Sequence, residues 1–209
     1  MRHEVEIFFE TDVALLNNDP EYPKLFKNAF NISDISNEEV VLALAQFIRT
    51  MNSGNSKFDK FLKGEEELSN EEFQGYELFF TEKGDCFHCH ATVFFTDNLL
   101  HNNALDASPD AGFFDVTGDS LDYGKFKSPT LRNIEYTAPY MHDGRYTTLA
   151  EVVEFYSTGL HYSATVDPLM KNLSYGGINL NSNEKTALVA FLKTLSDSDF
   201  LINPELSTS

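Results

Sequence analysis

The sequence contains no tryptophan, two cysteines, and 15 Lys and Arg residues against 33 Asp and Glu residues. The formal net charge of −18 argues against nucleic acid as a partner, because binding to its phosphate backbone depends on clustered Lys and Arg. No apolar run approaches the roughly 20 residues that a membrane-spanning helix needs, so we expect no membrane span. Met1 to Glu6 is too acidic for a secretory n-region, so we expect no signal peptide in this sequence.

The two cysteines, Cys86 and Cys89, would close too short a loop for a disulfide to stabilise much. They belong to Cys86-Phe87-His88-Cys89-His90, which has the Cys-x-x-Cys-His pattern of c-type haem attachment. In this pattern, both thiols form thioethers with the haem vinyl groups, and the adjoining His is the proximal iron ligand. The motif therefore predicts one covalent haem c on Cys86 and Cys89, with His90 on the iron.

Two other uses of the cysteines compete with haem. A structural zinc site generally needs four ligands, and His88 and His90 lie too close to the cysteines to complete a conventional knuckle. A thioredoxin-like redox pair needs a βαβ context, which this helical sequence lacks. Both alternatives stay open, and haem attachment is the favoured interpretation.

Helical periodicity dominates the rest of the chain, and strand signals are nearly absent. Capping boxes at Ser36 and Ser69 precede apolar residues at helical spacing. Between them, Phe58, Phe61 and Leu62 predict a short helix that ends near Gly64. Another helix is expected from Thr148, and a last one carries Ala187, Leu188, Phe191, Leu192 and Leu195. From Thr92 to about Pro139 the periodicity disappears, which indicates a long irregular segment able to wrap a cofactor.

Two longer motifs identify a resemblance. Residues 126–133 (FKSPTLRN) and 137–145 (TAPYMHDGR) closely resemble the bacterial di-haem cytochrome c peroxidase family, which includes the MauG-like enzymes. Similar stretches occur at 52–59, 95–97, 101–103 and 188–195, so the resemblance covers nearly the whole chain. Family members carry an N-terminal haem domain where peroxide reacts and a C-terminal haem domain that relays electrons.

The resemblance implies the C-terminal haem domain only, because the sequence has one attachment motif and lacks the Trp that relays electrons between the family's haems. The expected fold class is all-α. A cytochrome c-like haem domain with long irregular loops would occupy residues 65–209. Residues 1–64 would form a helical segment that packs on, or links to, an N-terminal peroxidatic haem domain outside this sequence. The family also implies a periplasmic location for the full-length protein.

The sixth iron ligand is implied by the same resemblance. Counting from His142, the family's distal ligand falls at Tyr156, where classical peroxidases have Met and MauG-like members have Tyr. The alternative for Tyr156 is a core aromatic whose hydroxyl is merely hydrogen-bonded, since helical spacing alone would put an aromatic there. Met141 is the weaker candidate for the distal ligand, because Met is more often a gap-filling core residue.

Three further residues are expected in the haem environment. His142 would hydrogen-bond a haem propionate, and Lys125 or Arg132 would neutralise one, because buried carboxylates need charge partners. Exposed salt bridges are an equal alternative for both cations. For His101 a surface or capping role is expected.

Calcium binds at the domain junction of family members, partly through backbone carbonyls that match Thr137 and Pro139. The third protein ligand comes from the N-terminal domain, and calcium needs six to eight oxygens, so we expect weak binding or none here. The acidic residues of the irregular segment lack EF-hand spacing and read as solvated loop carboxylates; these are Asp110, Asp115, Asp119 and Asp122.

The favoured hypothesis for function is electron transfer between a small redox protein, such as a cytochrome or a cupredoxin, and a peroxidatic haem. The chain alone is not expected to be a competent peroxidase, because no acid–base pair is evident beside an open iron position. The alternatives are a free-standing monohaem carrier and a haem-free truncated remnant. The acidic surface suits a basic protein partner, although solubility explains it equally well. A homodimer is left open.

Overall fold

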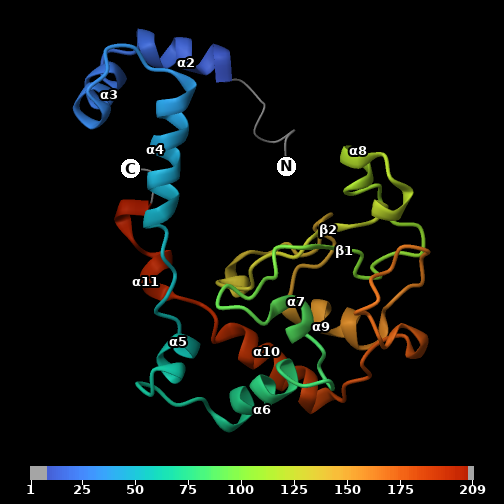
Figure 1. The fold of residues 1–209 in the computed structure, drawn as a ribbon. Helices are drawn as coiled ribbons and strands as arrows, with labels where there is room; N and C mark the ends of the chain where they lie inside the picture. Colours follow the sequence, from blue (N-terminus) through green and yellow to red (C-terminus); the bar gives the residue numbers. More distant parts are fainter. Residues whose placement is uncertain (1–8, 207–209) are drawn as a thin grey trace. The chain divides into compact units, whose positions relative to one another are not determined.

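The computed structural model describes residues 9–206 and divides between Asn52 and Ser53 into two units. Met1 to Glu6, on which the signal-peptide expectation rests, lie outside the described residues. The described part of the first unit contains the helices α2 (Phe9–Asn18), α3 (Tyr22–Phe30) and α4 (Asn37–Thr50), shown in blue in Figure 1. No helix in the described part is long and apolar enough to cross a membrane.

In the first unit, one amide side chain links α2 to the segment before α4, and an aromatic pair stacks within α3. Asn17 donates from Nδ2 to the carbonyl oxygen of Ile35 at 2.8 Å and accepts the Ile35 N–H at 2.9 Å. Phe26 is buried and stacks on Phe30 at 5.7 Å. The capping box expected at Ser36 is present and begins α4.

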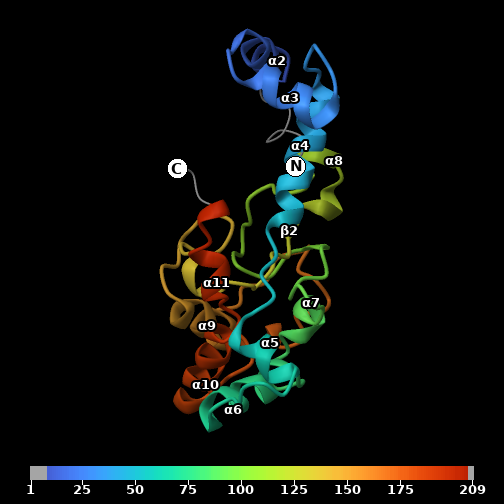
Figure 2. The same ribbon diagram turned by 90° about the vertical axis from the view of Figure 1, so that its left-hand side faces the viewer.

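The second unit carries the cysteine motif and is mostly helical. Its α-helices are α5 (Lys57–Leu62), α6 (Asn70–Phe79), α7 (Phe87–His90), α8 (Phe114–Thr117), α9 (Leu149–Thr158), α10 (Ser182–Lys193) and α11 (Ser198–Leu201). Its 3-10 helices are η1 (Ser120–Asp122), η2 (Ile134–Tyr136), η3 (Leu173–Tyr175) and η4 (Pro204–Leu206). Figure 2 shows α9 beside α10, with α7 on the other side of this unit.

The core of the second unit forms where α6 packs against α10. Gly75 permits the contact, because a Cβ at this position would lie 2.0 Å from the carbonyl oxygen of Ala187. Phe79 and Phe191 are almost completely buried and have ring centroids 5.2 Å apart. The helices predicted from the capping boxes at Ser69 and Thr148 are confirmed as α6 and α9.

The boundary between the units falls at 52/53, whereas the sequence analysis put it at 64/65. The physical reason is α5, whose Phe58 is 4% exposed and meets the Phe191 ring edge-on at 5.2 Å. Residues 53–64 therefore fold with the second unit. The expected role of the preceding helices, as a link to another haem domain, stays a prediction.

Residues 92–139 are mainly irregular, as the missing periodicity predicts, but they contain the strands β1 (Leu100–His101) and β2 (Phe126–Lys127). These strands pair antiparallel, with Leu100 opposite Lys127 and His101 opposite Phe126. The all-α expectation therefore holds only as a predominantly helical fold. Two-residue strands are too short to leave an alternating pattern in the sequence.

Candidate haem site

A tight turn connects α6 to the motif helix α7. The N–H groups of Gly84 and Asp85 both donate to the carbonyl oxygen of Thr81, at 3.1 and 2.9 Å. A Cβ on Gly84 would lie 2.1 Å from the carbonyl oxygen of Leu78, so the chain can pass there only as glycine. The turn places Cys86, Cys89 and His90 together on a single helical turn.

Both motif cysteines are free thiols. Burial, with further contributions from nearby acidic groups, raises the pKa of Cys86 to about 12 and that of Cys89 to about 11. The Cys86 thiol donates to the carbonyl oxygen of Gly84 at 3.2 Å. Two free thiols one helical turn apart fit the attachment of haem c through two thioethers.

His90 has the protonation and orientation that an iron ligand needs. Its Nδ1 lies 2.7 Å from the carbonyl oxygen of Phe95, which can only accept, so Nδ1 carries the hydrogen and donates. Burial lowers the pKa of His90, which favours the neutral ring. Nε2 therefore keeps its lone pair, and it has no hydrogen-bond partner among the described residues. This donor set fits a haem held by the two thiols and His90.

The segment after the motif folds back on it and fixes the Phe95 carbonyl. Phe95 is buried with φ of 52°, and the hydroxyl of Thr92 donates to the carbonyl oxygen of Thr96 at 2.6 Å. The Asp97 N–H then donates to the carbonyl oxygen of Cys89 at 2.9 Å. Sequence reasoning did not assign Phe95 this role, because a backbone carbonyl leaves no signal in residue type.

Tyr156 and Met141, the two distal candidates, meet at one amide group. Asn103 Nδ2 lies 3.1 Å from the Tyr156 hydroxyl and 3.7 Å from the Met141 sulfur. Burial raises the pKa of Tyr156 to about 12; the Asn103 hydrogen bond lowers it, and charge interactions with the Cys86 and Cys89 thiols add to the rise.

His142 and Lys125 have protein partners. His142 stacks on Phe126 at 3.8 Å, and its Nε2 pairs with Asp110 at 2.9 Å. Lys125 pairs with Asp122 at 3.0 Å. Asp110 and Asp122 thus each contact a basic side chain of the protein. The expected contacts of His142 and Lys125 with haem propionates stay predictions.

Arg132 is part of an internal ion pair between α5 and the loop before η2. Its guanidinium binds both carboxylate oxygens of Asp59, at 2.9 and 3.0 Å, and Nε donates to the carbonyl oxygen of Val93 at 2.9 Å. Burial raises the pKa of Asp59, but the hydrogen bonds from Arg132 and Ser56 outweigh this effect and lower it. The structure thus gives Arg132 a salt-bridge partner, and its expected contact with a haem propionate stays a prediction.

The calcium candidates lie in the turn after η2. The Thr137 hydroxyl donates to the carbonyl oxygen of Ile134 at 3.2 Å, and the Ala138–Pro139 peptide bond is cis. The carbonyl oxygens of Thr137 and Pro139 accept no hydrogen bond within the described residues. A calcium role for these carbonyls stays a prediction.

His101 differs most from its expected surface or capping role. Its side chain is 12% exposed and pairs with Asp97 through Nε2 at 2.8 Å and with Asp167 through Nδ1 at 2.7 Å. Burial lowers the pKa of His101, but the hydrogen bonds to Asp167 and Asp97 outweigh this effect and raise it. Cys89, Asp97 and His101 lie close enough to hold a metal ion. However, an imidazolium that donates from both nitrogens has no lone pair for one.

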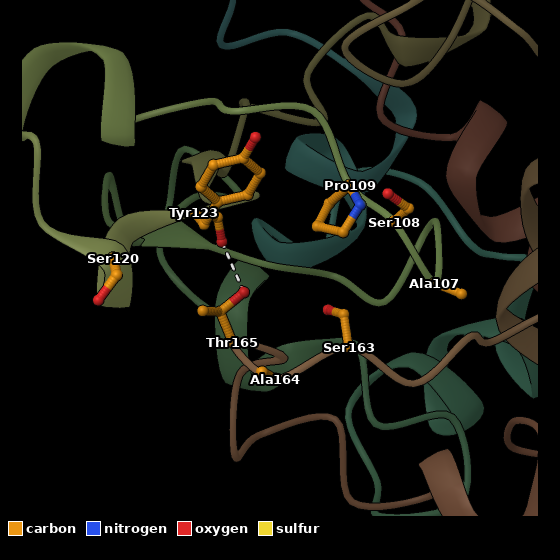
Figure 3. A pocket seen from close by; sticks show the side chains of 8 residues that line it. All are labelled: Ala107, Ser108, Pro109, Ser120, Tyr123, Ser163, Ala164 and Thr165. Carbon is orange, nitrogen blue, oxygen red and sulfur yellow. Dashed lines mark hydrogen bonds between the residues drawn. The ribbon is translucent and has the colours of Figure 1, made fainter.

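A surface pocket of about 380 Å³ lies beside this region (Figure 3). Small and hydroxyl-bearing residues line it, including Ser163 and Thr165, and the Thr165 hydroxyl donates to the carbonyl oxygen of Tyr123 at 2.6 Å. No thiol, imidazole or carboxylate lines the pocket.

Comparison with known proteins agrees with the motif and its setting. Residues 2–67 match the family model for di-haem cytochrome c peroxidase. The chain is 36% identical over 183 residues to cytochrome c551 peroxidase of Nitrosomonas europaea, with 84% of this chain and 49% of that protein covered. It is 34% identical over 197 residues to the methylamine utilization protein MauG of Methylorubrum extorquens, with 92% and 54% covered. The chain belongs to the MauG-like di-haem cytochrome c peroxidase family.

Solved structures support the same relationship. A MauG-like protein associated with microbial copper homeostasis superposes with a TM-score of 0.84 at 36% identity, covering 95% of this chain and 65% of that one. The di-haem peroxidase BthA from Burkholderia thailandensis shares the fold, with a TM-score of 0.63 at 20% identity over 77% of this chain and 51% of its own. Membership of the family implies haem as the cofactor. The chain spans about half the length of the curated relatives it matches.

Proposed function

We propose that residues 53–206 form a haem-c unit that relays electrons between a redox partner and a second haem. Cys86 and Cys89 would hold the haem covalently, and His90 would be the proximal iron ligand. The second haem would lie in the part of the family's length that this chain does not span. We propose that the protein works in the periplasm, because its family resemblance implies that location.

The observation that carries this proposal is the hydrogen bond from His90 Nδ1 to the Phe95 carbonyl oxygen at 2.7 Å. This bond fixes the neutral tautomer with its lone pair on Nε2, the form that binds haem iron. A buried ring held in this way next to two free thiols fits c-type haem better than zinc or a redox-active dithiol.

The proposed distal ligand is Tyr156. Haem bound here supplies a one-electron ferric–ferrous couple, and a phenolate ligand stabilises the ferric form, whereas a thioether raises the reduction potential. Tyr156 would contribute its hydroxyl, which Asn103 holds by a hydrogen bond at 3.1 Å. If His90 and Tyr156 both held the iron, this unit would not itself react with peroxide.

The identity of residue 156 and the similarity to a MauG-like protein support a MauG-like role for the full protein. In that role the second haem would react with peroxide, and this unit would exchange electrons during oxidation of a protein substrate. The net charge of −18 supports docking of a small basic redox protein, since opposite charge accelerates encounter.

The test is expression of the chain with a periplasmic signal and haem-maturation factors, followed by a pyridine haemochrome spectrum. The wild-type chain is expected to give the absorption band of covalently attached haem c. The Cys86→Ser/Cys89→Ser variant is expected to give none. A wild-type chain that folds under these conditions but carries no covalent haem would refute the proposed function.

A further inference from the structure

The two candidate distal ligands, Tyr156 and Met141, share one hydrogen-bond donor. Asn103 Nδ2 is 3.1 Å from the Tyr156 hydroxyl and 3.7 Å from the Met141 sulfur. The side-chain NH₂ of Asn has two hydrogens, so it can serve both acceptors at once. Tyr156 and Met141 come from different parts of the chain, and Asn103 is where they are brought together.

The backbone on both sides of Asn103 is fixed, so its amide cannot easily turn elsewhere. Asn102 is 2% exposed and donates from Nδ2 to Ser163 Oγ at 3.0 Å and to Thr165 Oγ1 at 2.9 Å. Figure 3 shows these two hydroxyl residues from the pocket side. On the other side, Ala104 is fully buried and its carbonyl oxygen accepts the His161 N–H at 2.8 Å.

Met141 and Tyr156 are also anchored through their neighbours. The Tyr140 N–H donates to the carbonyl oxygen of Tyr146 at 2.7 Å, and Met141 itself has φ of 70°. On α9, the carbonyl oxygen of Tyr156 accepts the Ile178 N–H at 3.1 Å. Both side chains are therefore held where they contact the Asn103 amide group.

We propose that Asn103 is a positioning residue. Its amide group would hold the Tyr156 hydroxyl at the distal iron position and keep the Met141 sulfur away from it. This inference rests on the proposed haem site. An N–H that donates to a phenolate forms a charge-assisted hydrogen bond, whereas a thioether sulfur is a weak acceptor. The amide therefore favours the arrangement with Tyr156 on the iron far more than the arrangement with Met141.

The experiment compares Asn103→Asp with Asn98→Asp in the haem-loaded full chain. Asn103→Asp keeps the side-chain size but replaces the two hydrogens with an acceptor that repels the phenolate. Asn98 is an exposed residue of the same type whose side chain makes no hydrogen bond with the described residues. The readouts are the ferric absorption spectrum and the midpoint reduction potential, neither of which depends on enzyme activity.

Asn103→Asp is expected to lose the phenolate-to-iron charge-transfer absorption and to shift the midpoint potential upward, toward a thioether ligand. Asn98→Asp is expected to match the wild type. Addition of Met141→Leu to Asn103→Asp is expected to abolish the thioether-type spectrum. If Asn103→Asp does not fold, Asn103→Leu removes the donors without adding charge, and the same loss and shift are expected.

Two negative results are distinguishable. A wild-type chain with covalent haem, together with Asn103 variants whose spectrum and potential are unchanged, overturns this inference and leaves the proposed function standing. A wild-type chain without covalent haem overturns the proposed function, and the inference falls with it.

Discussion

The Phe95 carbonyl oxygen and His90 Nδ1 lie 2.7 Å apart, and this hydrogen bond determines which ring nitrogen of His90 is available. A hydrogen-bond acceptor on the ring nitrogen that does not bind the metal also raises the basicity of a metal-bound imidazole. The bond depends on the turn formed by residues 92–96, which the Thr92 hydroxyl closes on the Thr96 carbonyl at 2.6 Å.

Thr92→Val should therefore weaken the electron donation from His90 to bound iron. The substitution keeps the side-chain shape but removes the hydroxyl that closes the turn. We expect a higher midpoint potential and, by analogy with other outer-shell partners, about a tenfold weaker His90–iron bond. Thr186→Val in α10 makes the same chemical change at an exposed helix position and is the control. Equal potentials in both variants would contradict the role given to the turn.

Tyr156→Phe tests the distal ligand directly. It removes the hydroxyl and leaves the aromatic ring that packs edge-on against Phe155 at 4.8 Å. We expect a changed ferric spectrum and a raised reduction potential, because the phenolate stabilises ferric iron. Met141→Leu should leave both unchanged. A spectrum that responds to Met141→Leu and not to Tyr156→Phe would transfer the ligand role to Met141.

A double-mutant cycle on Arg132 and Asp59 tests whether the arginine serves as the salt-bridge partner of Asp59 or as the partner of a haem propionate. Their side chains are only 15% and 11% exposed, so breaking this pair from one side should cost about 3 kcal/mol of unfolding free energy. If Arg132 acts through Asp59, the double variant Arg132→Gln/Asp59→Asn should lose less than the sum of the single losses. Additive losses, together with a changed potential in Arg132→Gln alone, would favour a haem propionate as its partner.

The pH dependence of stability should contain a contribution from His101. Its pKa is raised in the folded state by Asp167 and Asp97, so folding favours the protonated ring. The stabilisation is fully present below about pH 6.5, the ordinary His value, and is lost as the pH rises through the raised pKa. Urea unfolding between about pH 5.5 and 9 should show this decline in the wild type.

His101→Gln cannot titrate and should remove that part of the decline. We expect it to lose about 2 kcal/mol at the acid end of the range, the order of a charge-assisted hydrogen bond, and less at the alkaline end. Parallel wild-type and His101→Gln profiles would contradict a protonated His101 between the two carboxylates.

Gly75→Ala should destabilise the second unit strongly. The added Cβ would lie 2.0 Å from the Ala187 carbonyl oxygen, so α6 and α10 must separate, at a cost of about 3 kcal/mol. Gly118→Ala is the control, because its Cβ meets no atom within 4 Å and only the strain of φ 67° remains, about 1 kcal/mol. Thermal unfolding measures both. Equal losses would show that helix packing does not require Gly75.

The features that could be predicted from the sequence depend on residue type and on spacing between nearby residues. The capping boxes of α4, α6 and α9 and the apolar face of α10 are local patterns, and the structure contains all four helices. The cysteine motif likewise specifies its own chemistry, because two thiols and an imidazole at that spacing suit few other groups.

The features that sequence missed depend on contacts between distant residues. His101 lies between Asp97 and Asp167. Asp167 is 66 residues away in the sequence, so no local pattern could predict its contact with His101. Arg132 is held by Asp59, 73 residues earlier, which also explains why residues 53–64 fold with the second unit. The role of the Phe95 carbonyl could not be predicted for a different reason, because every residue has a backbone carbonyl.

The most direct test of the central claim is the intact mass of the purified chain under denaturing conditions, after expression with haem-maturation factors. Denaturation removes any haem held only by iron ligands, so a mass increase reports thioether bonds. We predict an increase equal to one haem in the wild type and in His90→Ala, and no increase in Cys86→Ala/Cys89→Ala. A wild-type mass equal to that of the bare polypeptide would contradict the account.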